Sequence, residues 1–306
     1  MGEVRQTVSP RPESINRLRT ALHSLSSHYN ETYLESDPLR FPHRYREPAD
    51  QEAVAFLSAM LAFGNVKVIF RSLDWILPRL GNSPTGAILK WPTRMPEELT
   101  LFSHRWFTGS DLHVLFLCLR EIYSEEESLE RYFLKGYDPK RPDIEDALES
   151  FSTRFRAKLF RISNQKKLSR GLQFLCSSPS GGSSCKRLNL FLRWVVRREP
   201  PDLGLWREIS PSKLLLPIDT HLQRLVQYVG LTKRRTAGWR MVMEATASLR
   251  KLDPVDPIQF DFSLSRLGIL DRCKHVADGE CCPQCPLNLL CILNNGEFPP
   301  KGTQTT

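Results

Sequence analysis

Apolar side chains recur at intervals of three and four residues along most of this sequence, which is the spacing of amphipathic α-helices. The first such stretch, residues 13–28, carries Ile15, Leu18, Leu22 and Leu25 on one side. Strands would instead show apolar and polar positions in alternation, and the sequence has no convincing example. The hydrophobic pattern therefore predicts an all-α fold.

Prolines, glycines and capping residues divide this pattern into separate helices. Asp50 is placed to cap the second helix, and Pro78 with Gly81 is placed to end the third. The further predicted helices cover about 51–63, 65–77, 110–119, 144–155, 185–198, 219–229, 236–251 and 256–269. The predicted loops and turns between them are 36–49, 82–109, 134–143, 177–184 and 199–217.

Charge indicates the kind of partner. The 306 residues include 43 lysines and arginines against 34 aspartates and glutamates, so the formal net charge is +9 and the isoelectric point about 9.2. Such an excess is typical of proteins with polyanionic partners. The chain has no apolar run long enough for a membrane span, and its first residues are polar. We therefore expect a cytoplasmic protein.

Five of the eight cysteines lie close together near the end of the sequence. Cys273, Cys282, Cys285 and Cys291 have the spacing C-x8-C-x2-C-x5-C, and Cys281 is a fifth neighbour that could replace Cys282. Disulfides are disfavoured in a reducing cytoplasm, so the cluster predicts a metal site. Four thiolates suit either tetrahedral zinc or a [4Fe–4S] cluster, and the spacing alone does not choose between them.

A short helix precedes the cysteines by about forty residues. Asp219 is a suitable N-cap because its carboxylate can accept the unpaired N–H groups of the first turn. An apolar face follows at helical spacing, and Gly230 suits the position just after the helix. Capping is the ordinary role of such an aspartate and is compatible with catalysis.

The predicted helix 185–198 combines a strongly apolar face with a basic one. Lys186, Arg193 and Arg197 are seven and eleven residues apart and therefore line up, which predicts a basic stripe open to a groove. An amine that acts as a nucleophile needs a pKa below the reference value of about 10.4. Burial and neighbouring arginines, such as Arg187, would lower the pKa of Lys186 in this way.

Two resemblances follow from these segments. The pattern Ile-Asp-Thr-His-x-x-Arg at 218–224, about fifty residues before the cysteines, resembles endonuclease III and related helix-hairpin-helix DNA glycosylases with a C-terminal iron–sulfur cluster. The apolar stretch 56–60 looks like the first barrel helix of that superfamily. More closely, the chain resembles a bacterial family catalogued as a domain of unknown function, through segments 37–45, 186–194 and 216–221.

The glycosylase resemblance implies two helical lobes with a groove between them. It would give one bilobal domain, with lobe A over about 50–198, lobe B over 14–49 plus 199–292, and disordered tails at 1–13 and 293–306. It further implies that Asp219 is the catalytic aspartate and that the cysteines hold a [4Fe–4S] cluster rather than Zn²⁺. The loop from Lys274 to Cys281 would contact DNA, and the protein would be a monomer that associates with the nucleoid.

The chain also departs from the glycosylase pattern. The hairpin motif Leu-Pro-Gly-x-Gly is absent, and Gly181 and Gly182 lie in the turn that replaces it, where their N–H groups could approach a phosphate. Met60 or Ala62 stands where those enzymes have a glutamine. The residues predicted to contact nucleic acid are Gly181, Gly182, Arg187, Arg193, Arg197, Arg224 and Lys274.

These features predict an enzyme of base-excision DNA repair. It would release a damaged or mispaired base from double-stranded DNA, with Asp219 as the catalytic carboxylate and Lys186 as the candidate nucleophile for an additional strand-cutting lyase step. The alternatives are an iron–sulfur protein that binds nucleic acid without catalysis, and a zinc-stabilised structural protein.

Overall fold

A computed structural model describes residues 12–293, and the described chain is mostly helical, which confirms the all-α prediction. The only described strands, β1 (Ser103–His104) and β2 (Phe107–Thr108), form a small antiparallel hairpin. The α-helices are α1 (Pro12–His28), α2 (Pro48–Met60), α3 (Val66–Leu80), α4 (Pro84–Leu89), α5 (Gly109–Glu126), α6 (Leu129–Leu134), α7 (Glu145–Ser163), α8 (Arg170–Leu175), α9 (Lys186–Val196), α10 (Thr220–Tyr228), α11 (Trp239–Leu252) and α12 (Asp261–Ile269). The 3-10 helices are η1 (Glu31–Ser36), η2 (Pro38–Arg40), η3 (Pro42–Arg44), η4 (Glu97–Leu101), η5 (Pro211–Lys213), η6 (Cys282–Gln284) and η7 (Asn288–Leu290).

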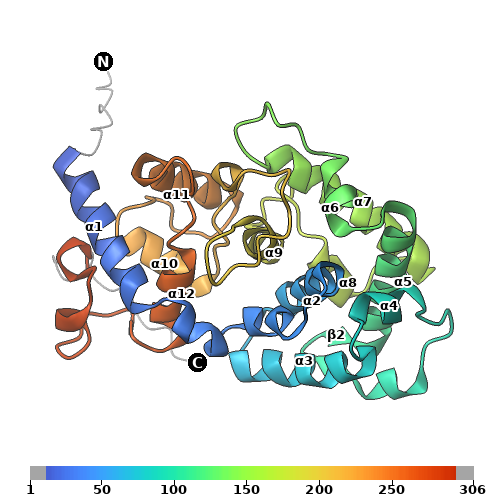
Figure 1. The fold of residues 1–306 in the computed structure, drawn as a ribbon. Helices are drawn as coiled ribbons and strands as arrows, with labels where there is room; N and C mark the ends of the chain where they lie inside the picture. The colour runs from blue at the N-terminus through green and yellow to red at the C-terminus, as the bar shows by residue number, and fades with distance from the viewer. Residues whose placement is uncertain (1–11, 294–306) are drawn as a thin grey trace.

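Helices α2 and α9 pack against each other at the centre of the molecule (Figure 1). Helices α1, α10, α11 and α12 lie to one side of this pair, and α3 to α8 lie to the other side. The predicted assignment of two lobes stays a prediction. Of the tails predicted to be disordered, residues 1–11 and 294–306 lie outside the described residues. No helix in the described part of the chain is both long and apolar enough to cross a bilayer.

Helix α2 is buried on nearly all sides, which explains its almost continuous apolar sequence. The prediction that Asp50 caps this helix is wrong, because the N-cap is Glu47 and the Asp50 carboxylate accepts the Thr85 N–H at 2.8 Å. The buried Glu52 accepts the Leu129 N–H at 2.9 Å and the Trp206 indole N–H at 2.8 Å. Both carboxylates thus accept hydrogen bonds from other parts of the fold.

Two further predictions about helix boundaries are corrected. Pro78 does not end α3, which continues to Leu80 and stops at Gly81, where φ is 66°. Pro78 has no N–H and removes one hydrogen bond of the helix, yet the backbone keeps its helical course until Gly81 adopts a positive φ. The region 82–109, predicted to be a broken loop, contains α4 and the hairpin; α6 and α8 were also not predicted. These short elements span too few residues to show a clear hydrophobic period.

A buried network of ion pairs joins α9, at the centre of the molecule, to α12 on one side of it. The Arg193 guanidinium donates from Nη2 to Asp202 at 3.0 Å and also pairs with Asp261 of α12. Arg197 pairs with the same Asp202 and, at 2.8 Å, with Asp256. The side chains of Arg193 and Asp202 are 1% and 0% exposed. The network therefore fixes α9 to α12 and to the loop that follows α9.

Loss of one charge from this network should destabilise the fold strongly. The change Arg193→Met would leave the Asp202 and Asp261 carboxylates buried with less compensation, so we expect the free energy of unfolding to fall by about 3–5 kcal/mol. Arg161→Met is the matched control, since Arg161 pairs with Glu121 at the surface with its side chain 61% exposed, and should lower that free energy by at most about 1 kcal/mol. Chemical denaturation measures both, and equal losses would contradict a stabilising role for the network.

Candidate functional site

The N-terminus of α10 presents the candidate catalytic carboxylate. Asp219 is the N-cap, as predicted, and its Oδ1 accepts the N–H groups of His221 at 3.0 Å and Leu222 at 2.8 Å. The side chain is half-buried, and Oδ2 has no hydrogen-bond partner among residues 12–293. One oxygen thus holds the helix start while the other remains available.

The segment before Asp219 lies against the segment that opens α9. The Ser184 hydroxyl donates to the Ile218 carbonyl at 3.1 Å, which joins the residue before the cap to the turn before Lys186. Lys186 is half-buried, and its ammonium donates to the Ala62 carbonyl, just after α2, at 2.9 Å. The structure therefore brings together the two segments with the candidate catalytic residues, which are separated in the chain by α9 and the long loop after it.

Asp219 also lies close enough to the buried ion network to influence it. The pKa of Asp261 is raised mainly by burial; Arg193 opposes this shift, and the negative charge of Asp219 adds to it. The pKa of Arg193 is raised even though burial alone would lower it, because Asp202 and Asp261 stabilise its charged form. The start of α10 therefore lies close to a buried network of paired charges.

The predicted basic stripe on α9 is wrong for Arg193 and Arg197. Both side chains are buried, and their charges are matched by carboxylates, so neither is accessible to a phosphate. Their spacing does place them on one face of α9, but this face points into the protein. Arg187 is also buried, yet no ion pair with it occurs in the described part of the chain; its guanidinium lies 3.5 Å from the ring centre of Phe174.

The Gly/Ser-rich turn before α9 does not offer the predicted N–H groups to an anion. The Gly181 N–H donates to the Ser178 hydroxyl at 3.3 Å, and the Gly182 N–H donates to the Pro179 carbonyl at 2.8 Å. The Gly182 carbonyl accepts the Trp239 N–H at 3.1 Å, which attaches the turn to the start of α11. The turn therefore serves as a connection between helices.

Arg224 and Lys274 are the predicted nucleic-acid contacts that the structure leaves at the surface. Arg224 is exposed on α10, and no ion pair with it occurs in the described range. The Lys274 ammonium pairs with Asp278 at 2.9 Å and is half-exposed. Arg224 lowers the pKa of His275, after burial as the main cause, so it lies near the cysteine loop that contains Lys274.

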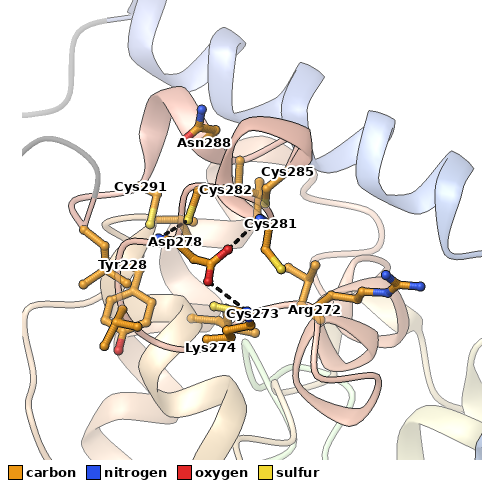
Figure 2. A pocket seen from close by; sticks show the side chains of 16 residues that line it. Tyr228, Arg272, Cys273, Lys274, Asp278, Cys281, Cys282, Cys285, Asn288 and Cys291 are labelled. Atoms are coloured by element: carbon orange, nitrogen blue, oxygen red, sulfur yellow. Dashed lines mark hydrogen bonds and ion pairs between the residues drawn. The ribbon is translucent and has the colours of Figure 1, made fainter.

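The C-terminal cysteines line a pocket of about 40 Å³ against α10 (Figure 2). The walls include Leu225 and Tyr228 of α10 and the thiol side chains of the loop, and the Ile292 N–H donates to the Tyr228 carbonyl at 3.0 Å. The Asp278 N–H donates to the Cys282 sulfur at 3.3 Å. The cysteines in the wall are Cys273, Cys281, Cys282, Cys285 and Cys291.

Four of these five thiols are electrostatically coupled, which means that the charge of one raises the pKa of another: Cys273, Cys282, Cys285 and Cys291. Burial is the main cause that raises the pKa of Cys273, and the thiols of Cys291, Cys285 and Cys282 add to it. Cys281 is not among the thiols that raise the pKa of Cys273; it raises the pKa of Tyr29, as Cys285 also does, and that of Lys274. Within residues 12–293, no three His, Cys, Asp or Glu side chains converge on a position for a single metal ion.

A histidine pair connects the cysteine loop with the start of α10. Cys273 Sγ lies 3.9 Å from His275 Nδ1, and His275 Nε2 lies 3.4 Å from Nδ1 of His221, the second residue after Asp219. A Cβ on Gly268 would lie 2.7 Å from the His221 Cβ, so this glycine lets α12 approach α10 closely. No local pattern in the sequence signals this connection, because His221 and His275 are far apart in the chain.

Residues 37–270 match the model of a family described as "Protein of unknown function (DUF2400)". The chain belongs to this family. The DUF2400 match covers most of the chain and includes Lys186 and Asp219, but it ends before Cys273. No curated protein and no solved structure matches the chain. The resemblance to endonuclease III therefore stays a prediction, and the family description supplies no activity.

The coupling of the thiols leads to a test that separates two adjacent cysteines. If a metal cluster is bound by the four coupled thiols, Cys282→Ser should abolish its binding and lower the soluble yield, because the ligands also close the loop. Cys281→Ser is the matched control and should leave the metal content unchanged. Iron and sulfide analysis after anaerobic purification measures both, and the reverse result would assign the ligand to Cys281.

Proposed function

We propose that this DUF2400 protein is a DNA N-glycosylase, with Asp219 as its catalytic carboxylate. The observation that carries the proposal is the hydrogen bond between Ser184 and Ile218, which joins the segments before Lys186 and Asp219. The half-buried position of Asp219 supports it, because a carboxylate sealed in the core could not act on a substrate.

The chemistry of base excision suits a carboxylate held in this way. As the bond between the base and C1′ breaks, positive charge develops on the sugar, and a nearby negative charge stabilises it. The same carboxylate can accept a proton from the attacking water. The N-cap hydrogen bonds fix Oδ1 of Asp219, so Oδ2 is the oxygen proposed to act.

A lysine in the adjacent segment would extend the reaction to strand cleavage. The Lys186 amine, once deprotonated, would attack C1′ as the base leaves with its electron pair; the C1′–O4′ bond would then break, with O4′ taking up a proton, to give a Schiff base between the lysine and the opened sugar. Elimination of the 3′ phosphate from that intermediate cuts the strand. In the structure the Lys186 ammonium donates to Ala62, so it would exchange this hydrogen bond for the substrate.

The four coupled thiols are the residues proposed to hold a [4Fe–4S] cluster, with zinc as the alternative. Their shared pocket and the hydrogen bond from Asp278 to Cys282 suit thiolate ligands. When bound, the cluster would serve as a cross-link of the loop. Burial raises the pKa of the Cys273 and Cys285 thiols, and a bound cation would oppose this shift.

Double-stranded DNA is the proposed partner, with the target base turned out of the helix. The net charge of +9 favours a polyanion. Arg224 on α10 and Lys274 in the cysteine loop are both exposed and are the proposed phosphate contacts. Arg193 and Arg197, which were predicted for the same role, are buried and are not proposed as phosphate contacts.

The change Asp219→Asn tests the carboxylate while keeping the helix cap, because asparagine is an equally good N-cap. We expect release of free base from lesion-bearing duplexes to fall by more than about 100-fold, with the affinity for DNA and the unfolding free energy nearly unchanged. Full activity of this variant would refute the assignment of Asp219. Release of no base by the wild type from any lesion would favour a DNA-binding protein without catalysis.

The lyase step has its own test. Borohydride reduction of a mixture with abasic-site DNA should trap a covalent adduct with the wild type and none with Lys186→Ala. Lys186→Arg is the matched control, since it keeps the charge but not the nucleophilic amine, and should also give no adduct. An adduct that persists in both variants would exclude Lys186 as the nucleophile.

A further inference from the structure

Three aromatic side chains from separate parts of the chain form a partly exposed cluster, here called the aromatic platform: Phe63, Trp106 and Phe174. Phe63 follows α2, Trp106 lies in the turn between β1 and β2, and Phe174 belongs to α8. The rings of Phe63 and Trp106 are stacked with centroids 5.4 Å apart, and the Phe174 ring meets both at 4.9 and 5.3 Å. Phe174 is 37% exposed, so the platform reaches the surface.

Three arginines surround this platform. The guanidinium carbons of Arg105 and Arg170 lie 4.6 and 4.5 Å from the Trp106 ring centre, and both side chains are exposed. The guanidinium of Arg187 lies 3.5 Å from the Phe174 ring centre. In the described part of the chain, none of the three has a salt bridge with a carboxylate.

The charge of Arg187 stands out against its neighbours on α9. Arg193 and Arg197 are buried to the same degree and are matched by aspartates, whereas Arg187 is only 5% exposed and meets aromatic faces instead. Burial lowers the pKa of Arg187 to about 9. A guanidinium buried without a carboxylate destabilises the fold, which suggests that its charge serves a ligand.

Two buried hydrogen-bond donors at the platform also lack partners within residues 12–293. They are Nη1 of Arg187 and the indole Nε1 of Trp106. A carboxylate near α8 is that of Asp111, but it accepts the Thr108 N–H at 2.8 Å and the Ser169 hydroxyl. The site therefore combines exposed aromatic surface with positive charge and with two buried donors that have no partner in the described part of the chain.

A ligand for this site needs a flat ring and acidic oxygens, and a nucleotide has both. We propose that the aromatic platform stacks an unpaired base of a nucleic-acid strand, while the exposed Arg105 and Arg170 bind the adjoining phosphates and the buried charge of Arg187 adds to the positive potential behind Phe174. Sequence-tolerant stacking on aromatic rings beside arginines is how proteins hold single strands. The inference rests on the proposed function for its choice of a nucleic acid as the ligand.

The platform lies beside the candidate nucleophile. Lys186 precedes Arg187 on α9, and its ammonium donates to Ala62, the residue before Phe63. A strand held on the platform would thus pass the amine proposed to attack C1′.

Two pairs of variants test the platform by fluorescence anisotropy with a short labelled single strand. Phe174→Ala should raise Kd by about five- to 150-fold, the range measured for loss of one base stack. Phe160→Ala is the matched control, because Phe160 is a similarly exposed phenylalanine on α7, 48% exposed, and should change Kd less than twofold.

The double variant Arg105→Gln with Arg170→Gln tests the phosphate contacts. The slope of log Kd against log salt concentration should fall by about 1.4, as expected for the loss of two phosphate contacts on a single strand. The double variant Arg131→Gln with Arg141→Gln removes the same charge from exposed sites elsewhere and should leave the slope unchanged. Equal effects of the test and control variants would overturn the platform.

These binding measurements separate the platform from the proposed catalysis. Weakened binding by Phe174→Ala in a protein that releases no base from any lesion would support the platform and refute the glycosylase. Base release that depends on Asp219, with unchanged binding by Phe174→Ala, would refute only the platform. Tight binding of an acidic peptide instead of the single strand would refute the choice of ligand.

Discussion

The interaction on which the rest of the structure depends is the buried pairing of Arg193 with Asp202 and Asp261. It connects the central helix α9 with the long loop after α9 and with α12, which lies to one side of α9. An ion pair at such depth requires close matching of every charge, because an unmatched one would be left without solvation. The network therefore restricts how α9 and α12 can be positioned relative to each other.

That restriction determines where the candidate chemistry lies. Arg266 of α12 pairs with Asp37 and donates to Ser36 at 3.0 Å, so the segment before α2 is attached to the same helix. Helix α10 packs on α12, where Gly268 allows the close approach to His221. Asp219 consequently lies close to the buried ion network, and the cysteine loop packs against the C-terminal end of α10.

Arginines in this chain have three different environments, and each suggests a different role. Arg193 and Arg197 are neutralised by aspartates and hold the fold together. Arg224 is exposed and suits a phosphate contact at the surface. Arg187 is buried against aromatic rings with no carboxylate in the described residues, which suits recognition of a ligand. A net charge of +9 includes all three kinds and does not distinguish them.

The sequence by itself determined the elements with long-range periodicity. The long helices, the N-cap at Asp219 and the grouping of the cysteines are local properties, set by spacing and by capping chemistry along a few turns. Short helices such as α8 carry no such periodic signal. The local sequence makes Asp50 look like a helix cap, and it cannot show the contact with Thr85, which comes from a distant part of the chain.

Only the tertiary structure decided which polar faces meet solvent. The spacing of Lys186, Arg193 and Arg197 places them on one side of a helix, but periodicity does not say whether carboxylates from distant segments cover that side. The meeting of Phe63, Trp106 and Phe174 and the contact between His221 and His275 were equally inaccessible, because each joins residues far apart in the chain. Burial and pairing arise from the packing of whole elements, and no local pattern encodes them.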